Sequence, residues 1–186
     1  MTIDETLKDA DTKMKGAVSV LQEELSGIRT GRANPRLVER LQVDYYGART
    51  PLVQLASISV PEPRLLVIQP FDRSAMAAME KAIMQSDLGL TPSNDGTVIR
   101  LAFPPLTEER RKDLIKVARE RAEDGRVAVR NVRRHHKETL ERLERGGEIS
   151  EDDLKRAERE IQRLTDQYVA EVDRMLEHKE QELREV

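Results

Sequence analysis

The sequence predicts an α+β protein, in which an antiparallel three-helix bundle carries an inserted small β/α/β domain. Two observations support this fold class. Apolar residues recur every three or four positions over residues 3–28, 108–145 and 151–183, which is the period of an amphipathic helix. Between the first two of these segments the pattern changes, and seven of the eight prolines fall within residues 35–104.

The composition agrees with long, thin helices rather than with one thick core. Of the 186 residues, 36% are charged and 3% are aromatic, whereas soluble domains have roughly 25% charged residues. Helices with a single apolar stripe leave most of their surface in water and so accommodate this balance. The regular apolar spacing also distinguishes the chain from a disordered one.

The first helix is predicted over residues 3–28. Its apolar positions follow the helical repeat of 3.6 residues per turn. They are Ile3, Leu7, Ala10, Met14, Val18, Leu21, Leu25 and Ile28. The helix ends before the run Thr30-Gly31-Arg32-Ala33-Asn34-Pro35, because Gly and Asn-Pro interrupt helices.

Residues 31–104 have the size and the punctuation of an inserted domain. Alternating and short apolar runs indicate strands, and one stretch with helical spacing indicates a short helix. The predicted elements are, in order, strands at 41–47, 58–60 and 65–68, a helix at 74–85 and a strand at 98–103.

The second and third long helices are expected to be antiparallel neighbours. The second begins after Pro104-Pro105 with Thr107 as its N-cap, and Gly146-Gly147 ends it. Ser150 then caps the third helix, with acidic residues in its first turn. The short loop between them favours an antiparallel pair.

These elements predict a bundle of residues 1–30 and 105–186 and an inserted domain of residues 31–104. Two connections that contain Gly and Pro join the two parts, and we expect them to form a double hinge rather than plain surface loops. The predicted hinge residues are Thr30, Gly31, Phe103, Pro104, Pro105 and Leu106.

The net charge of −3 conceals an uneven distribution. Residues 105–149 contain 13 basic and 10 acidic residues, residues 150–186 contain 7 and 12, and residues 125–137 contain five Lys or Arg and no acid. Projected at about 100° per residue, these five residues and one upstream Arg fall on one strip of the second helix, beside its apolar face. This basic stripe consists of Arg119, Arg126, Arg130, Arg133, Arg134 and Lys137.

An Arg-rich stripe on a straight helix suits contact with nucleic-acid phosphates, because guanidinium groups bind phosphate in a bidentate manner. The alternative is a solvated face, or one neutralised by the acidic third helix. The scarcity of aromatic residues disfavours a reader of single strands by base stacking. It favours folded RNA or duplex contacted through its backbone.

The sequence contains none of the motifs GxxxxGK[ST], GxGxxG, HExxH and GxSxG, and we find no catalytic constellation. It has no Cys, which excludes disulfides and thiolate chemistry. We expect no cofactor and no metal. His135 and His136 point about 100° apart on a helix and so would not easily share one metal. His136 falls on the apolar stripe and is expected to pack inside the bundle, whereas His178 is expected to be solvated.

No apolar run approaches the roughly 20 residues of a membrane span, and the first residues lack the apolar core of a signal peptide. We therefore expect a cytoplasmic protein without membrane contact, and a monomer.

Several short motifs are common individually and distinctive as an ordered set. They are Ile28-Arg29-Thr30-Gly31-Arg32-Ala33, Tyr45-Tyr46-Gly47, Pro51-Leu52, Gln54-Leu55-Ala56, Phe71-Asp72-Arg73, Lys81-Ala82-Ile83, Ser86-Asp87-Leu88-Gly89-Leu90, Pro104-Pro105-Leu106-Thr107-Glu108-Glu109-Arg110-Arg111-Lys112 and Val127-Ala128-Val129-Arg130-Asn131-Val132-Arg133-Arg134. With this set the chain resembles the bacterial ribosome recycling factor family over essentially its whole length. His135, His136, Lys137 and residues 139–148 carry no part of the resemblance.

The resemblance implies an L-shaped molecule of roughly transfer-RNA dimensions, with the small domain on two hinges. It implies a non-enzymatic factor that binds the large ribosomal subunit after termination. With elongation factor G and GTP, such a factor splits the post-termination complex so that ribosomes can reinitiate, and the partner uses the GTP. It also implies that arginines of the bundle contact ribosomal RNA, first Arg133, then Arg130, Arg29 and Arg32, and that elongation factor G acts mainly on the small domain and hinge.

Two other classes of protein remain as alternatives. Three long helices with apolar stripes also fit a structural coiled-coil or dimerisation module. An enzyme could have an unrecognised site within residues 31–104, although no motif supports one.

Overall fold

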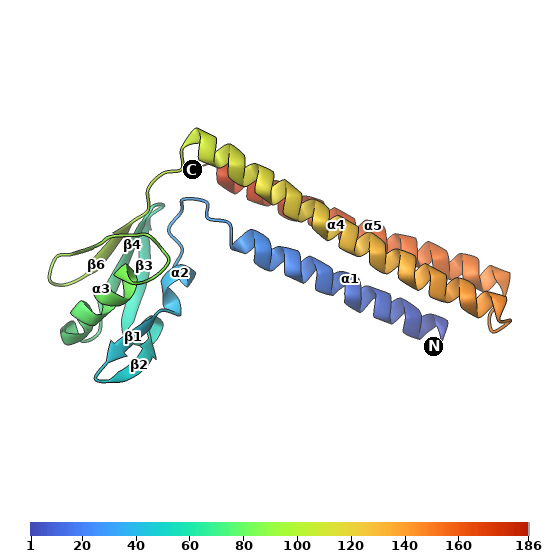
Figure 1. The fold of residues 1–186 in the computed structure, drawn as a ribbon, viewed down its shortest axis with the longest axis horizontal. Helices are drawn as coiled ribbons and strands as arrows, with labels where there is room; N and C mark the ends of the chain where they lie inside the picture. Colours follow the sequence, from blue (N-terminus) through green and yellow to red (C-terminus); the bar gives the residue numbers. More distant parts are fainter. Residues whose placement is uncertain (186) are drawn as a thin grey trace. The chain divides into compact units, whose positions relative to one another are not determined.

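The computed structural model describes residues 1–185 and consists of two compact units. One unit comprises Met1–Arg29 and Glu108–Glu185, and the other comprises Thr30–Thr107. The first contains the three long helices and the second the strands (Figure 1). Each unit has its own hydrophobic core. The α+β fold class predicted from the sequence is confirmed. Among the described residues, no helix combines the length and the apolar character needed to cross a membrane.

The bundle consists of helices α1 (Ile3–Ser26), α4 (Glu108–Arg145) and α5 (Glu151–Arg184), and each of the three contacts the other two. Two of the helices begin with a capping box. At α1, Thr2 Oγ1 accepts from the Glu5 amide at 3.2 Å while Glu5 Oε2 accepts from the Thr2 amide at 2.8 Å. At α5, the predicted N-cap Ser150 is confirmed, because its Oγ accepts from the Asp153 amide at 3.0 Å.

Three core clusters along the bundle show the direction of each helix. Ala10 packs with Leu140 and Ile161, Met14 with Val129 and Leu164, and Leu21 with Ala122 and Val172. From the first to the third cluster, the residue numbers increase along α1 and α5 and decrease along α4. Helix α4 is therefore antiparallel to both of the others, as the stripes predict.

Gly125 of α4 lies against Leu21 of α1. A Cβ atom at this position would be 3.2 Å from Leu21 Cδ2. The absence of a side chain therefore lets the buried Leu21 pack directly against the backbone of α4.

The small unit contains two antiparallel sheets and two short α-helices. Strands β1 (Gln42–Tyr45) and β2 (Ala48–Pro51) form a hairpin, and a four-stranded sheet has the order β3-β4-β6-β5. The strands of that sheet are β3 (Ala56–Glu62), β4 (Leu65–Pro70), β5 (Pro92–Asn94) and β6 (Ile99–Ala102). The helical elements are α2 (Arg36–Glu39), η1 (Leu52–Gln54), η2 (Arg73–Ala75) and α3 (Met76–Met84). Buried residues of α3, β4 and β6, such as Met79, Leu66 and Leu101, form the core of this unit.

The sequence missed four elements of the small unit and overextended another. Helix α2, strand β2, the 3-10 helix η1 and strand β5 were not predicted, because none of them carries a repeating apolar pattern. The strand predicted over 41–47 ends at Tyr45. Tyr46 and Gly47 instead form the hairpin turn, with positive φ angles of 50° and 81°.

Candidate nucleic-acid interface

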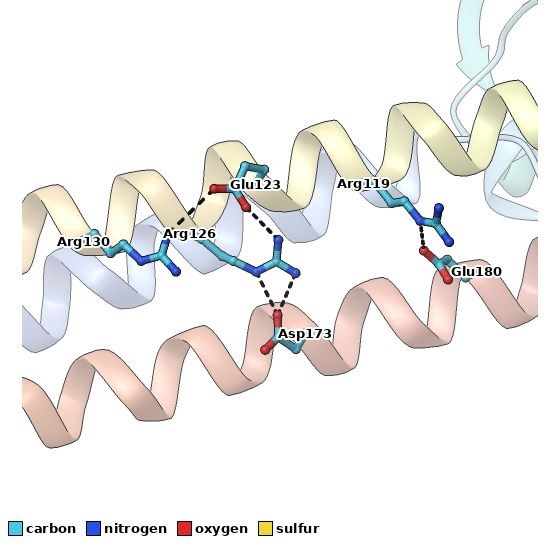
Figure 2. A network of polar contacts seen from close by, with 6 residues as sticks. All are labelled: Arg119, Glu123, Arg126, Arg130, Asp173 and Glu180. Carbon is cyan, nitrogen blue, oxygen red and sulfur yellow. Dashed lines mark hydrogen bonds and ion pairs between the residues drawn. The ribbon is translucent and has the colours of Figure 1, made fainter.

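Arg126 lies at the centre of an ion-pair network between α4 and α5. Its Nε and Nη2 donate to Asp173 Oδ1 at 2.8 and 2.7 Å, and its Nη1 donates to Glu123 Oε2 at 3.0 Å (Figure 2). Its side chain is only 19% exposed. Partial burial acts to lower the pKa of Arg126, but hydrogen bonds to the two carboxylates outweigh burial and raise that pKa. Arg126 therefore holds α5 against α4 as a permanent cation.

Two further members of the basic stripe face carboxylates of α5. Arg119 Nε donates to Glu180 Oε1 at 2.7 Å, and this hydrogen bond raises the pKa of Arg119. Lys137 Nζ lies 4.0 Å from Glu158 Oε1. The alternative interpretation, a stripe neutralised by the acidic third helix, thus applies to Arg119, Arg126 and, more weakly, Lys137.

The other three members of the stripe carry little or no compensating charge. Arg130 Nη1 lies 3.7 Å from Glu123 Oε1, with a side chain that is 47% exposed. Arg133 Nη1 makes a long hydrogen bond of 3.4 Å to the neutral amide of Gln162. Within residues 1–185 the exposed Arg134 side chain has no hydrogen-bond or ion-pair partner. We call Arg130, Arg133 and Arg134 the open arginine patch.

The spacing of residues along the sequence contained a signal for these partners. An antiparallel hairpin of helices brings together residues at nearly equal distances from its loop, here residues 146–150. From Arg119 to Arg126 is seven residues forward along α4, and from Glu180 to Asp173 is seven residues back along α5. The acid missing from residues 125–137 is therefore supplied by α5, and by Glu123 one turn before the run.

The structure separates Arg29 and Arg32 from the stripe in the chain. Arg29 follows α1 in the bundle unit, whereas Arg32 belongs to the small unit, and both are exposed. Each of the two interacts with other residues of the chain.

Of the predicted hinge residues, Phe103 differs from the rest. Its side chain is buried in the core of the small unit, and its amide donates to the Arg64 carbonyl at 2.8 Å. Thr30, Gly31, Pro104, Pro105 and Leu106 lie outside helices and strands, and the φ of 78° at Gly31 favours glycine.

His136 packs inside the bundle as predicted, and its side chain is only 3% exposed. Its Nδ1 lies 2.8 Å from the Val132 carbonyl and its Nε2 lies 2.6 Å from Asp9 Oδ2. Hydrogen bonds from His136 and then Lys13 lower the pKa of Asp9, so this carboxyl is ionised. The contact between His136 and Asp9 thus ties α4 to α1. The sequence did not identify Asp9 as this partner.

Across residues 1–185, no three His, Cys, Asp or Glu side chains are grouped so as to hold a metal ion. His178 is exposed and lies 3.1 Å from Glu182 Oε1.

Comparisons with known proteins all point to one family. The sequence profile of the family described as "Ribosome recycling factor" matches residues 21–183. The ribosome-recycling factor of Acidothermus cellulolyticus is 56% identical over 184 residues, which are 99% of this chain and 100% of that protein. The ribosome-recycling factor of Shouchella clausii is 57% identical over 178 residues, 96% of each chain.

Two solved structures are also similar over nearly the whole chain. A solution structure of the ribosome recycling factor has a TM-score of 0.80 at 46% identity, and the match covers 100% of this chain and 99% of that one. The second presents models for the T. thermophilus ribosome recycling factor and the E. coli elongation factor G bound to the E. coli post-termination complex. Its TM-score is 0.65 at 50% identity, with 98% and 99% coverage.

Proposed function

Because the chain belongs to the ribosome recycling factor family, we propose that it binds the large ribosomal subunit after termination and, with elongation factor G and GTP, splits the post-termination complex. The ribosome is then free to reinitiate. Factors of this family are not enzymes and carry no cofactor, and elongation factor G uses the GTP. The similarity to a structure that combines such a factor with elongation factor G on the post-termination complex supports this assignment. The site of action is the cytoplasm, where the ribosomes are.

The open arginine patch carries the RNA-binding part of the proposal. Arg133 and Arg130 are the primary phosphate contacts and Arg134 adds to them, because α5 leaves these three cations without a close carboxylate partner. Arg119, Arg126 and Lys137 mainly hold the bundle together and contribute to the field around the patch. Arg29 and Arg32 are further candidate contacts, supported by the family motif alone.

The two connections between the units are proposed to flex when elongation factor G acts on the small unit. Thr30 and Gly31 in one connection, and Pro104, Pro105 and Leu106 in the other, lie outside regular elements. Phe103 is assigned a different role, since its buried side chain fixes the second connection to the small unit. Bending is expected to begin after this anchor.

A monomer is the proposed state, because the apolar stripes of α1, α4 and α5 face one another in three core clusters. These stripes are therefore not available to pair with a second copy. Sedimentation at micromolar concentration should give the mass of a single chain, and a dimer would support the dimerisation module instead.

A double substitution, Arg130→Ala with Arg133→Ala, tests the interface. Loss of two phosphate contacts should weaken large-subunit binding by about 10- to 100-fold and reduce the salt slope by about two. The matched control is Arg121→Ala with Arg142→Ala, which removes two exposed arginines of α4 that point away from the stripe. Equal loss of affinity in both double variants would refute the site, provided that circular dichroism shows unchanged helicity.

Splitting itself is tested by light scattering of post-termination ribosomes. The full chain with elongation factor G and GTP should lower the scattering as subunits separate, whereas omission of the chain should leave it unchanged. No splitting under any of these conditions would refute the proposed function.

A further inference from the structure

The small unit contains a groove of about 710 Å³ between helix α3 and the β1–β2 hairpin. Helix α3 contributes Ala78, Lys81 and Ala82, and its C-cap contributes Gln85. These residues recur at intervals of three or four and so share one face. The hairpin contributes Gln42, Asp44 and Arg49. Asp44 and Arg49 are directly opposite each other in the register and therefore lie on the same face of the hairpin.

Two cations of this groove have no internal partner. Within residues 1–185 the side chains of Arg49 and Lys81 make no hydrogen bond and no ion pair, and both residues are exposed. This differs from the basic stripe of α4, where carboxylates of α5 occupy half of the cations. Two unpaired cations from separate elements that line one groove indicate a site for an anion.

The hairpin turn explains why Arg49 stays unpaired although Asp44 is opposite. Asp44 Oδ1 accepts from the Gly47 amide at 3.1 Å and so stabilises the turn. Tyr46 and Gly47 both have positive φ in this turn. The carboxylate is therefore directed to the turn, and the groove keeps two positive charges and one negative charge on its walls.

The remaining lining residues define the class of anion. Gln85 adds an amide donor, and the small side chains of Ala78 and Ala82 leave room for a ligand. Lys, Arg and Gln are donors that nucleic-acid-binding proteins direct to backbone phosphates. No aromatic residue lines the groove to anchor a protein partner. A net charge of about +1 matches the single negative charge of a phosphodiester.

We infer that this groove is a second RNA contact, in which Arg49 and Lys81 bind a backbone phosphate. The choice of RNA as the source of the phosphate rests on the proposed function. The groove is built entirely from the small unit, so it is independent of the open arginine patch on α4.

The test uses the full chain labelled with ¹⁵N and titrated with a short RNA hairpin. Amide signals of residues 42–49 and 78–86 should shift, in addition to those of residues 126–137. Arg49→Gln and Lys81→Gln should each weaken binding at the groove by about three- to tenfold, as expected for loss of one exposed charge-assisted contact. Arg73→Gln is the matched control, since this exposed arginine of the same unit lies outside the groove.

Two further titrations identify the source of the anion. Inorganic phosphate that shifts the same amides, with weaker affinity than the hairpin, supports a phosphate site filled by RNA. A Glu-rich peptide that shifts them where the hairpin does not would overturn the inference in favour of a protein partner. Shifts confined to residues 126–137, or equal effects of the groove variants and Arg73→Gln, would also overturn it. Neither result bears on subunit splitting, which the scattering assay measures separately.

Discussion

Substitution of Glu123 by Gln should strengthen binding to the large ribosomal subunit. The carboxylate of Glu123 lies 3.0 Å from Arg126 Nη1 and 3.7 Å from Arg130 Nη1, on the edge of the open arginine patch (Figure 2). Gln keeps the size of the side chain and removes the charge. Arg130 then loses its only carboxylate neighbour within 4.0 Å among residues 1–185, while Arg126 retains Asp173.

The expected size of the effect follows from Coulomb's law. A phosphate oxygen about 3 Å beyond Arg130 lies about 7 Å from the carboxylate of Glu123. At that distance two like charges in a solvent-exposed setting repel by about 0.6 to 1 kcal/mol, which corresponds to about a three- to fivefold gain in affinity. The free energy of unfolding should change by less than about 1 kcal/mol, because exposed ion pairs contribute little.

Binding is measured as the dissociation constant for the large subunit at several salt concentrations. The Glu123→Gln variant should bind more tightly at low salt and converge with the parent chain as salt screens the charges. The matched control is Glu120→Gln, which makes the same change at an exposed position about one turn earlier, outside the network. If both variants gain equally, only net charge matters and the assignment of the open arginine patch is wrong.

Two further predictions concern the core of the bundle. Tyr168 should titrate near pH 12, because burial and its hydrogen bond to Asp11 raise the pKa of Tyr168 to about 12. The stabilisation that protonated Tyr168 provides is complete below the ordinary pKa of about 10 and is lost as the pH rises through 12. Ultraviolet absorbance of tyrosinate follows this titration, and Asp11→Asn should move it to lower pH; an unchanged midpoint would contradict the role of Asp11. Leu140→Ala should lower the free energy of unfolding by about 2 to 5 kcal/mol in urea titrations, because removal of its fully buried side chain leaves a cavity. A loss below about 1 kcal/mol would contradict this expectation and show that neighbouring side chains fill the cavity.

The three long helices could be predicted because apolar residues recur at intervals of three or four positions over many turns of each helix. The predicted start and end of α4 and α5 agree with the structure to within about one residue, and only the end of α1 shifts, from Ile28 to Ser26. Two short strands of the small unit lack such repetition. Strand β2 has the sequence Ala-Arg-Thr-Pro and strand β5 has Pro-Ser-Asn, and each is specified by pairing with a neighbouring strand rather than by its own residues.

The sequence predicted which cations lie along one side of α4, but not which of them are paired with carboxylates. Angular projection placed six cations on one side of α4, but their partners are far away in the sequence. Glu180 is 61 residues from Arg119 and Asp173 is 47 residues from Arg126. Side-chain pairing across two packed helices depends on their register. Periodicity within either helix does not contain that register, and distance from the loop gives it only to within a few residues.

Pairing half of the basic stripe has a consequence for a factor that must leave the ribosome after each round. Six unpaired cations along one helix would bind many RNA surfaces with similar strength, because phosphate contacts carry no sequence information. The carboxylates of α5 confine the open charge to Arg130, Arg133 and Arg134, over about 6 Å of helix. Affinity gained by Glu123→Gln is therefore expected mainly as slower dissociation. Tighter binding of that variant should accompany unchanged or slower multiple-round splitting, since release of the factor is part of each round.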